Sequence, residues 1–286
     1  MTINYWYEFA KIDNIKPITK YRIIKVFKHP SNFYNTKDFN ILKTNLITRK
    51  QLQYIRNINY SNNIDEYLFK KGISIINIVD QNYPILLKNI YDPPITLFLK
   101  GNIALINEKM IAIVGSRIGS NYGLKACSEI SEKLSINNYV IVSGMANGID
   151  TMAHNSAYEN KTIAVLGFGH DYCYPNNNRM LKKALEENGL TVSEYIPSKK
   201  PEKYHFPARN RIISGLSFAT IIIEASIKSG SLITAGFTIE NNRELFVLPH
   251  NLYSNSDGCN YLIRDGANII TSIDELCAEI KNVEIC

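Results

Sequence analysis

From Met110 onward, short hydrophobic runs alternate with segments whose apolar residues follow helical spacing. Six runs rich in β-branched residues have the length of buried strands: Ile111–Val114, Val140–Val142, Ile163–Leu166, Thr191–Val192, Thr220–Ile223 and Leu245–Leu248. The helical segments between them are Leu124–Leu134, Ile149–Tyr158, Arg179–Asn188 and Leu232–Asn241. Because apolar strands linked by helices form sheets that are covered on both faces, the pattern predicts an α/β fold with a mostly parallel, doubly wound sheet.

The first part of the chain follows a different pattern, in which short helical segments are separated by polar breaks. Helical spacing is clear in two segments, Lys16–Phe27 and Thr48–Asn57. Strand-like runs begin only at Ile73–Val79 and Leu97–Gly101. We therefore predict two parts, a small N-terminal helical module over residues 1–70 and a sheet domain over residues 71–286.

Charge is distributed unevenly along the chain. The 286 residues carry 32 Lys and Arg against 26 Asp and Glu, a net charge of +6. Residues 1–100 hold 15 basic and 7 acidic residues, whereas residues 101–286 hold 17 and 19. A positive balance is typical of proteins with anionic partners. The helical module could face nucleic acid or simply pack against the sheet domain, while a nucleic-acid site on the sheet domain must be a local patch.

Composition excludes several classes of protein. A hydrophobic content of 45% supplies a core, and no run approaches the roughly 18 apolar residues of a membrane span. Residues 1–20 contain no apolar stretch typical of a signal peptide. The five cysteines are scattered and lack zinc-ligand spacing. We expect a cytoplasmic protein with reduced thiols, no metal site and no membrane partner.

Small residues follow several predicted strands, where a parallel sheet binds its ligands. These stretches are Gly115–Ser120, Ser143–Asp150, Gly167–Gly169 and Ser229–Ala235. Glycine and serine before a helix let a phosphate approach free N–H groups and the positive end of the helix dipole. The stretches therefore predict a site for phosphate or a nucleotide backbone. Neither G-x-G-x-x-G nor G-x-x-x-x-G-K-[ST] occurs, so we expect neither a dinucleotide cofactor nor an ATP site.

The segment Lys199–Arg211 combines five basic residues with two aromatic ones. Pro201 and Pro207 are expected to keep it non-helical as far as Arg209. Cations contact phosphates and an aromatic face stacks with any base, which is typical of a single-strand binding surface. The segment could equally be a solvated loop whose Arg209 and Arg211 form salt bridges to the sheet. Its charge pattern leaves both interpretations open.

Candidates for catalysis are few. Asp150 and His154 lie four residues apart on a predicted helix, where Asp150 is expected in the first turn and His154 as a packed side chain. Glu224 is expected to cap N–H groups of the glycine- and serine-rich loops. No serine has an evident His-Asp partner set. We therefore predict no catalytic residues and no enzyme activity.

Taken in order along the chain, these features resemble the DprA/Smf family. The motifs that carry the resemblance are Tyr83-Pro84, Asp92-Pro93-Pro94, Val114–Arg117, Ser143–Asp150 with His154, Tyr174-Pro175, Ser193–Tyr195, Phe206–Leu216, Glu224-Ala225, Ser229–Ala235 and Gly266-Ala267. They cover roughly residues 83–270 in unbroken order. The Arg-Asn-Arg and Ser-Gly-Ser motifs at this separation are highly specific.

The resemblance implies an extended Rossmann-like domain that forms a homodimer and binds single-stranded DNA. It also implies binding without ATP, cofactor or sequence preference, and delivery of the DNA to RecA recombinase in natural transformation or recombination. Carried over by motif position, the DNA site consists of Arg117, Ser143, Gly144, Lys203, Phe206, Arg209, Arg211, Ser229, Gly230 and Ser231. One departure is His250, because the family usually has glycine there, which leaves the backbone of this loop open.

An alternative function comes from another class of protein. Rossmann-like nucleotide phosphoribohydrolases bind a nucleotide phosphate on a similar sheet and cleave a glycosidic bond. Their Pro-Gly-Gly-x-Gly-Thr signature is absent here, and Glu224 followed by Ser229-Gly230-Ser231 is only distantly similar. Release of free base from nucleoside monophosphates would identify this activity.

Overall fold

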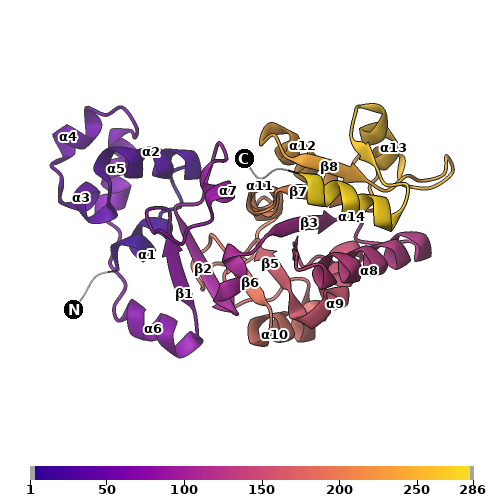
Figure 1. The fold of residues 1–286 in the computed structure, drawn as a ribbon. Coiled ribbons are helices and arrows are strands. Elements are labelled where there is room, and N and C mark those ends of the chain that lie inside the picture. Colours follow the sequence, from indigo (N-terminus) through magenta and orange to yellow (C-terminus); the bar gives the residue numbers. More distant parts are fainter. Residues whose placement is uncertain (1–3, 284–286) are drawn as a thin grey trace.

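A computed structural model describes residues 4–283, which contain one sheet of nine strands (Figure 1). The strands are β1 Ser74–Asn77, β2 Thr96–Gly101, β3 Met110–Val114, β4 Val140–Ser143, β5 Thr162–Leu166, β6 Leu190–Ser193, β7 Ala219–Ile222, β8 Glu244–Val247 and β9 Asn268–Ile269. Their spatial order is β1-β2-β6-β5-β4-β3-β7-β8-β9. Strands β3 to β9 are parallel, whereas β2 pairs antiparallel with both β1 and β6. The α/β prediction is confirmed, with an antiparallel extension at one edge.

Helices cover both faces of this sheet (Figure 1). Beyond the N-terminal module they are α7 Ile85–Lys88, α8 Asn121–Ile136, α9 Ile149–Ser156, α10 Arg179–Glu187, α11 His205–Leu216, α12 Ser231–Glu240, α13 Asp257–Arg264 and α14 Ile273–Asn282. One buried cluster joins α8, α9 and α14 to one face, and another joins α11 and α12 to the opposite face.

Strand β3 shows how the sequence produces these layers. Its residues are all buried, and successive side chains in a strand point to opposite faces. Met110, Ala112 and Val114 belong to the cluster with α11 and α12, while Ile111 and Ile113 belong to the cluster with α8, α9 and α14. A strand buried on both faces needs an apolar residue at every position, so these strands are continuous hydrophobic runs.

The residues before the sheet form the helical module. Its helices are α1 Tyr5–Ala10, α2 Pro17–Phe27, α3 Pro30–Asn35, α4 Asp38–Leu42, α5 Arg49–Arg56 and α6 Ile64–Lys71. Phe9, Phe33 and Leu52 belong to the same buried cluster as Leu97 and Leu99 of β2, so the module packs against the sheet. The predicted module is present, and the division of the chain into domains at residue 70 stays a prediction.

Helix α11 begins earlier than the sequence predicts. The non-helical segment expected before Arg209 is wrong, because α11 starts at His205 and includes Pro207. Proline is tolerated there since the first four N–H groups of a helix have no carbonyl partner within it. The sequence pattern also missed α7, α13 and β9, which are short.

Four of the five cysteines lie within the described residues. Cys127, Cys173, Cys259 and Cys277 are free thiols, and Cys286 lies outside the described residues. Within residues 4–283, no three His, Cys, Asp or Glu side chains gather where a metal ion could bind. No helix in this part of the chain combines the length and apolar character needed to cross a membrane.

Candidate nucleic-acid-binding site

Two neighbouring cavities lie where the loops after the strands meet the start of α11. The large cavity has a volume of about 740 Å³ and is lined by the loop after β3, the loop between β7 and α12, and residues 253–256. The small cavity, of about 60 Å³, is lined by residues that include Asn147, Tyr174 and Pro175. Arg117, Phe206 and Arg209 line both. The loops therefore converge at the carboxyl edge of the sheet, as predicted for a parallel sheet.

Two buried carboxylates hold these loops in place. Asp150, in the first turn of α9, accepts hydrogen bonds from the N–H groups of Gly144 at 3.1 Å and Ala146 at 3.3 Å. Glu224 Oε2 accepts from the N–H and the hydroxyl of Ser120, both at 3.0 Å. Burial raises the pKa of Asp150 above its usual value. The expected first-turn and capping roles are confirmed, and both carboxylates are occupied by the protein itself.

Arg209 is buried on α11 and bonded to the backbone of the sheet. Its Nη1 donates to the carbonyl of Gly144 at 2.7 Å and also to the carbonyl of Val165. Burial lowers the pKa of the guanidinium to about 10 although Asp150 opposes this shift. A Cβ added at Gly144 would collide with the guanidinium, so a side chain there would displace Arg209 from these bonds. Arg209 lines the cavities while it ties α11 to the ends of β4 and β5.

Arg211 has a different environment from Arg209. Its guanidinium donates to both oxygens of Glu194, at 3.0 and 2.7 Å, and its Nε lies 3.5 Å from an oxygen of Asp92. These carboxylates raise the pKa of Arg211 against the effect of burial. Arg211 lines neither cavity. Arg211 therefore forms the salt bridges that were one of the two interpretations of this segment, and its charge is directed to Glu194 and Asp92 and not into the cavities.

One exposed cation, Arg117, and two aromatic rings, Phe206 and Tyr174, line the small cavity. Arg117 is exposed and has no hydrogen-bond or ion-pair partner for its guanidinium among the described residues. Phe206 lies on the first turn of α11, where its ring centroid is 5.1 Å from that of Tyr174 at an interplanar angle of 41°. Tyr174 is 44% exposed. Lys203 is exposed but lines neither cavity.

Sequence reasoning did not assign Tyr174 to the site. It was noted only as part of a Tyr-Pro motif, and nothing in its spacing places it beside Phe206, which is 32 positions later. The loop that carries Tyr174 is held by the side chain of Asn178. This amide donates to the carbonyl of Met145 at 3.0 Å, just before α9, and to the hydroxyl of Thr151 at 2.9 Å, within α9. The signal available in the sequence was an aromatic residue in a polar, proline-containing loop.

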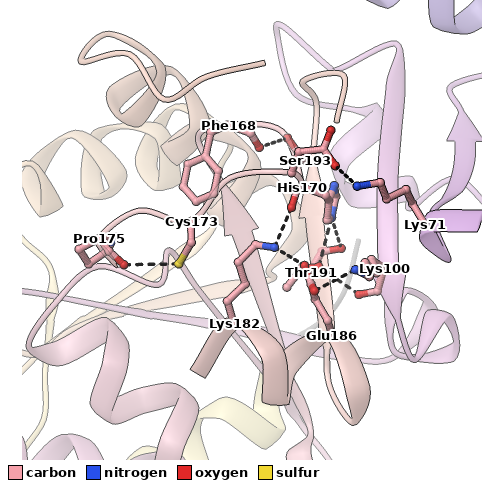
Figure 2. Close-up of polar contacts among 11 residues, drawn as sticks. Lys71, Lys100, Phe168, His170, Cys173, Pro175, Lys182, Glu186, Thr191 and Ser193 are labelled. Carbon is pink, nitrogen blue, oxygen red and sulfur yellow. Dashed lines mark hydrogen bonds and ion pairs between the residues drawn. The ribbon is translucent and has the colours of Figure 1, made fainter. Parts of the chain in front are cut away.

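A buried polar network fixes the other side of the loop that carries Tyr174 (Figure 2). The hydroxyl of Ser193 donates to the carbonyl of Phe168 at 2.8 Å, and Lys182 Nζ donates to the carbonyl of His170 at 2.8 Å. Lys182 also pairs with Glu186, whose second oxygen lies 3.0 Å from Lys100 Nζ. Since each of these groups has a partner, the loop is held in one arrangement.

The same network reaches the helical module. Lys71 at the end of α6 forms an ion pair of 3.0 Å with Asp171, and Tyr67 donates to the same carboxylate. His170 precedes Asp171 in the chain, and its Nε2 lies 3.1 Å from the hydroxyl of Thr191 (Figure 2). Burial lowers the pKa of His170 to about 4, so the ring is neutral near pH 7.

The predicted serines differ in their access to the cavities. The Ser143 hydroxyl is buried and donates to the carbonyl of Ile113 at 2.6 Å. Ser229 and Ser231 line the large cavity, with their hydroxyls 3.1 Å apart. A Cβ on Gly230 would meet no atom within 4 Å, so the backbone there is open to a ligand. The Ser229–Ser231 loop therefore faces the cavity, whereas the Ser143 hydroxyl joins the ends of β4 and β3.

His250 fits its loop without strain. It is not among the described residues with positive φ, so a side chain is accommodated where the family usually has glycine. Its backbone forms two hydrogen bonds with the Asn260 side chain, at 3.1 and 2.8 Å. Its Nε2 lies 2.8 Å from the carbonyl of Ile223. The histidine thus joins the loop to the end of β7.

The sequence of this chain is similar to those of known proteins over most of its length. Residues 74–281 match the family model described as DNA recombination-mediator protein A. DNA processing protein DprA of Streptococcus pneumoniae is 45% identical over 208 residues, which cover 72% of this chain and 73% of that protein. Protein Smf of Synechocystis is 35% identical over 293 residues, covering 98% of this chain and 73% of that protein.

Two solved structures are similar to the whole fold or to most of it. The X-ray structure of DprA from Streptococcus pneumoniae has a TM-score of 0.83 at 35% identity and covers 100% of both chains. A structure of DprA from Helicobacter pylori, whose description concerns a single-stranded DNA binding mode, has a TM-score of 0.67 at 34% identity. It covers 74% of this chain and 97% of its own.

Proposed function

Because the chain belongs to the DNA recombination-mediator protein A family, we propose that it binds single-stranded DNA without ATP and without sequence preference. The description of the Helicobacter pylori relative supports the choice of single strands. We propose further that the protein acts as a cytoplasmic homodimer and delivers the bound strand to RecA recombinase in transformation or recombination.

One observation carries the proposal of a single-strand site. An exposed guanidinium, Arg117, and a pair of adjacent aromatic rings, Phe206 and Tyr174, line the same small cavity. A cation beside a stacking surface can hold a phosphate while the base lies on the ring. Stacking accepts any base, whereas duplex DNA keeps its bases stacked on one another. The arrangement therefore favours unpaired nucleotides without selecting a sequence.

The remaining residues take distinct parts in this proposal. The Ser229–Ser231 loop offers hydroxyls and open backbone to a neighbouring phosphate at the start of α12. Lys203, which is exposed just before α11, contacts the strand outside the cavities. Arg209 fixes the shape of the site through its bonds to Gly144 and Val165. The DNA thus meets exposed cations and rings on a rigid backbone.

We propose that the protein is not an enzyme. Catalysis by Asp150 or Glu224 would require a carboxylate free to exchange protons with a substrate. Both accept hydrogen bonds from the loops that they cap. The phosphoribohydrolase alternative depends on Glu224 as a catalytic carboxylate, and its hydrogen bonds to Ser120 do not favour that role.

The proposal is tested by fluorescence anisotropy with oligonucleotides of one length but different form. Single-stranded dT and mixed-sequence strands are expected to bind with similar affinity in the absence of ATP, and the matching duplex more weakly. The affinities for both single strands should fall with added salt, since counterions are released from the strand on binding. Equal affinity for duplex and single strand, or a requirement for ATP, would contradict the proposal.

A further inference from the structure

The positive charge of the protein is concentrated in one short part of the helical module. Residues 16–50, which we call the basic segment, contain nine Lys and Arg and one acidic residue, Asp38. The segment comprises α2, α3 and α4 and the first two residues of α5. Eight of the nine cations are exposed: Lys16, Arg22, Lys25, Lys28, Lys37, Lys43, Arg49 and Lys50. This surface accounts for the charge asymmetry of the whole chain.

The charge of the basic segment is not neutralised by the protein. Among residues 4–283, none of the eight exposed cations forms an ion pair with a carboxylate. The single acid, Asp38, pairs with Arg56 at 3.0 Å, outside the segment. Two cations lie over aromatic rings instead, Lys25 over Tyr21 and Lys43 over Phe39, each at 4.6 Å. The surface therefore presents cations and rings together.

The sheet domain lacks such a surface of its own. Residues 101–286, which form most of the sheet domain, carry 17 basic and 19 acidic residues. Near the cavities, the guanidinium of Arg209 is bonded to carbonyls and that of Arg211 to carboxylates. A polyanion that approaches the proposed site thus meets few free cations there. Long-range attraction follows the net charge of a surface, and the basic segment supplies it.

We propose that the basic segment is a second binding surface for the phosphodiester backbone of the strand held in the cavities. This inference rests on the proposed function. Figure 1 shows α2 to α5 at the end of the molecule opposite α12 and α13, so the two surfaces can act on different stretches of one strand. The segment also lies outside residues 74–281, which match the family model.

Nucleic acid fits this surface better than an anionic membrane. A helix that lies in a bilayer interface buries an apolar face in lipid. The apolar side of α2 is already used, because Ile23 and Ile24 are 1% and 3% exposed and belong to the core shared with the sheet. Phe39, by contrast, is 67% exposed beside Lys43. An exposed ring next to a cation suits an unpaired base and its phosphate.

The test compares two variants of the full chain that lose the same charge. In the first, Lys16, Arg22, Lys25 and Lys28 are replaced by glutamine; in the second, the exposed Lys109, Lys125, Lys133 and Lys183 of the sheet domain are replaced in the same way. Both are titrated across a salt series with fluorescent oligo-dT of about 6 nucleotides, which fits the cavities alone, and of about 40 nucleotides, which can span both surfaces.

The first variant is expected to bind the long strand about tenfold more weakly and to lower its salt slope by up to about 2.8, or about 0.7 for each phosphate that is no longer neutralised. Its affinity for the short strand should match wild type, and the second variant should resemble wild type with both. Unchanged long-strand binding in the first variant, or an equal loss in both variants, overturns the proposal. The first variant is also tested for binding to phosphatidylglycerol vesicles. If it loses vesicle binding but keeps the wild-type affinity for both strands, the basic segment is a membrane surface and the proposal is overturned. Wild type that binds neither strand would instead refute the proposed function.

Discussion

Replacing Arg211 by methionine tests whether this cation belongs to the protein core or to the DNA site. Both oxygens of Glu194 accept from the guanidinium, at 3.0 and 2.7 Å, and Arg211 is 6% exposed. Removing one partner of a buried ion pair costs about 3–5 kcal/mol, because the remaining charge is left desolvated. We expect the lower end, about 3 kcal/mol, since Asp92 is 25% exposed and partly hydrated.

The expected loss converts into a measurable shift of the melting temperature. Unfolding entropy is about 2.1 cal/mol/K per residue, or about 600 cal/mol/K for a chain of this length. A loss of about 3 kcal/mol therefore lowers the Tm by about 5 °C. The control is Arg179→Met on α10, an exposed arginine whose replacement should change stability by less than about 0.5 kcal/mol. Both variants are followed by urea and thermal unfolding.

A second variant separates the ion pair from simple loss of packing. Arg211→Met combined with Glu194→Leu removes both main charges, and replacing a buried pair by apolar groups is far less costly than breaking it. We expect the double variant to recover part of the lost stability. If Arg211→Met instead melts like wild type while the salt slope of oligo-dT binding becomes flatter, then Arg211 contacts DNA and its place in the core is misjudged.

Three further predictions concern the site and its supports. Arg117→Ala and Lys203→Ala should each flatten the salt slope of oligo-dT binding by up to about 0.7 without changing the Tm; parallel slopes would place the DNA elsewhere. Phe206→Ala or Tyr174→Ala should weaken oligo-dT binding by about 1–3 kcal/mol but leave an abasic strand unaffected, whereas equal losses on both strands would rule out stacking. Burial lowers the pKa of His154 to about 3, so stability is lost as the pH falls from about 6.5 toward that value, by about 2 kcal/mol at pH 5. Urea unfolding of His154→Gln should lack this part of the decline, and a decline like that of wild type would contradict the assignment.

The strands and most helices of the sheet domain were predictable because each carries its own signal. A run such as Ile111–Val114 is apolar at every position, which a strand buried on both faces requires. The loops after β3 and β4 were predictable for the same reason, since glycine and serine before a helix mark a strand-to-helix turn. Local sequence thus predicted which loops line the cavities.

The partners of individual side chains were not predictable. A basic stretch has the same composition whether its cations face solvent or the core, so Arg211 and Lys203 looked equivalent. Their difference depends on Glu194, which tertiary structure brings beside Arg211 from the end of the neighbouring β6. Tyr174 and Phe206 likewise meet only because two loops converge. Such contacts connect residues far apart in sequence and leave no local pattern.

Burial decides which cations can act on DNA. To contact a phosphate, Arg209 would have to release the carbonyls of Gly144 and Val165, and a buried acceptor left without a donor costs about 1–3 kcal/mol. Two such losses are comparable to the whole gain from a charge-assisted hydrogen bond, about 1.5–3 kcal/mol. An exposed cation such as Arg117 gives up only water. The salt dependence of binding should therefore follow the exposed cations, while Arg209 determines the shape of the cavity into which they bring the strand.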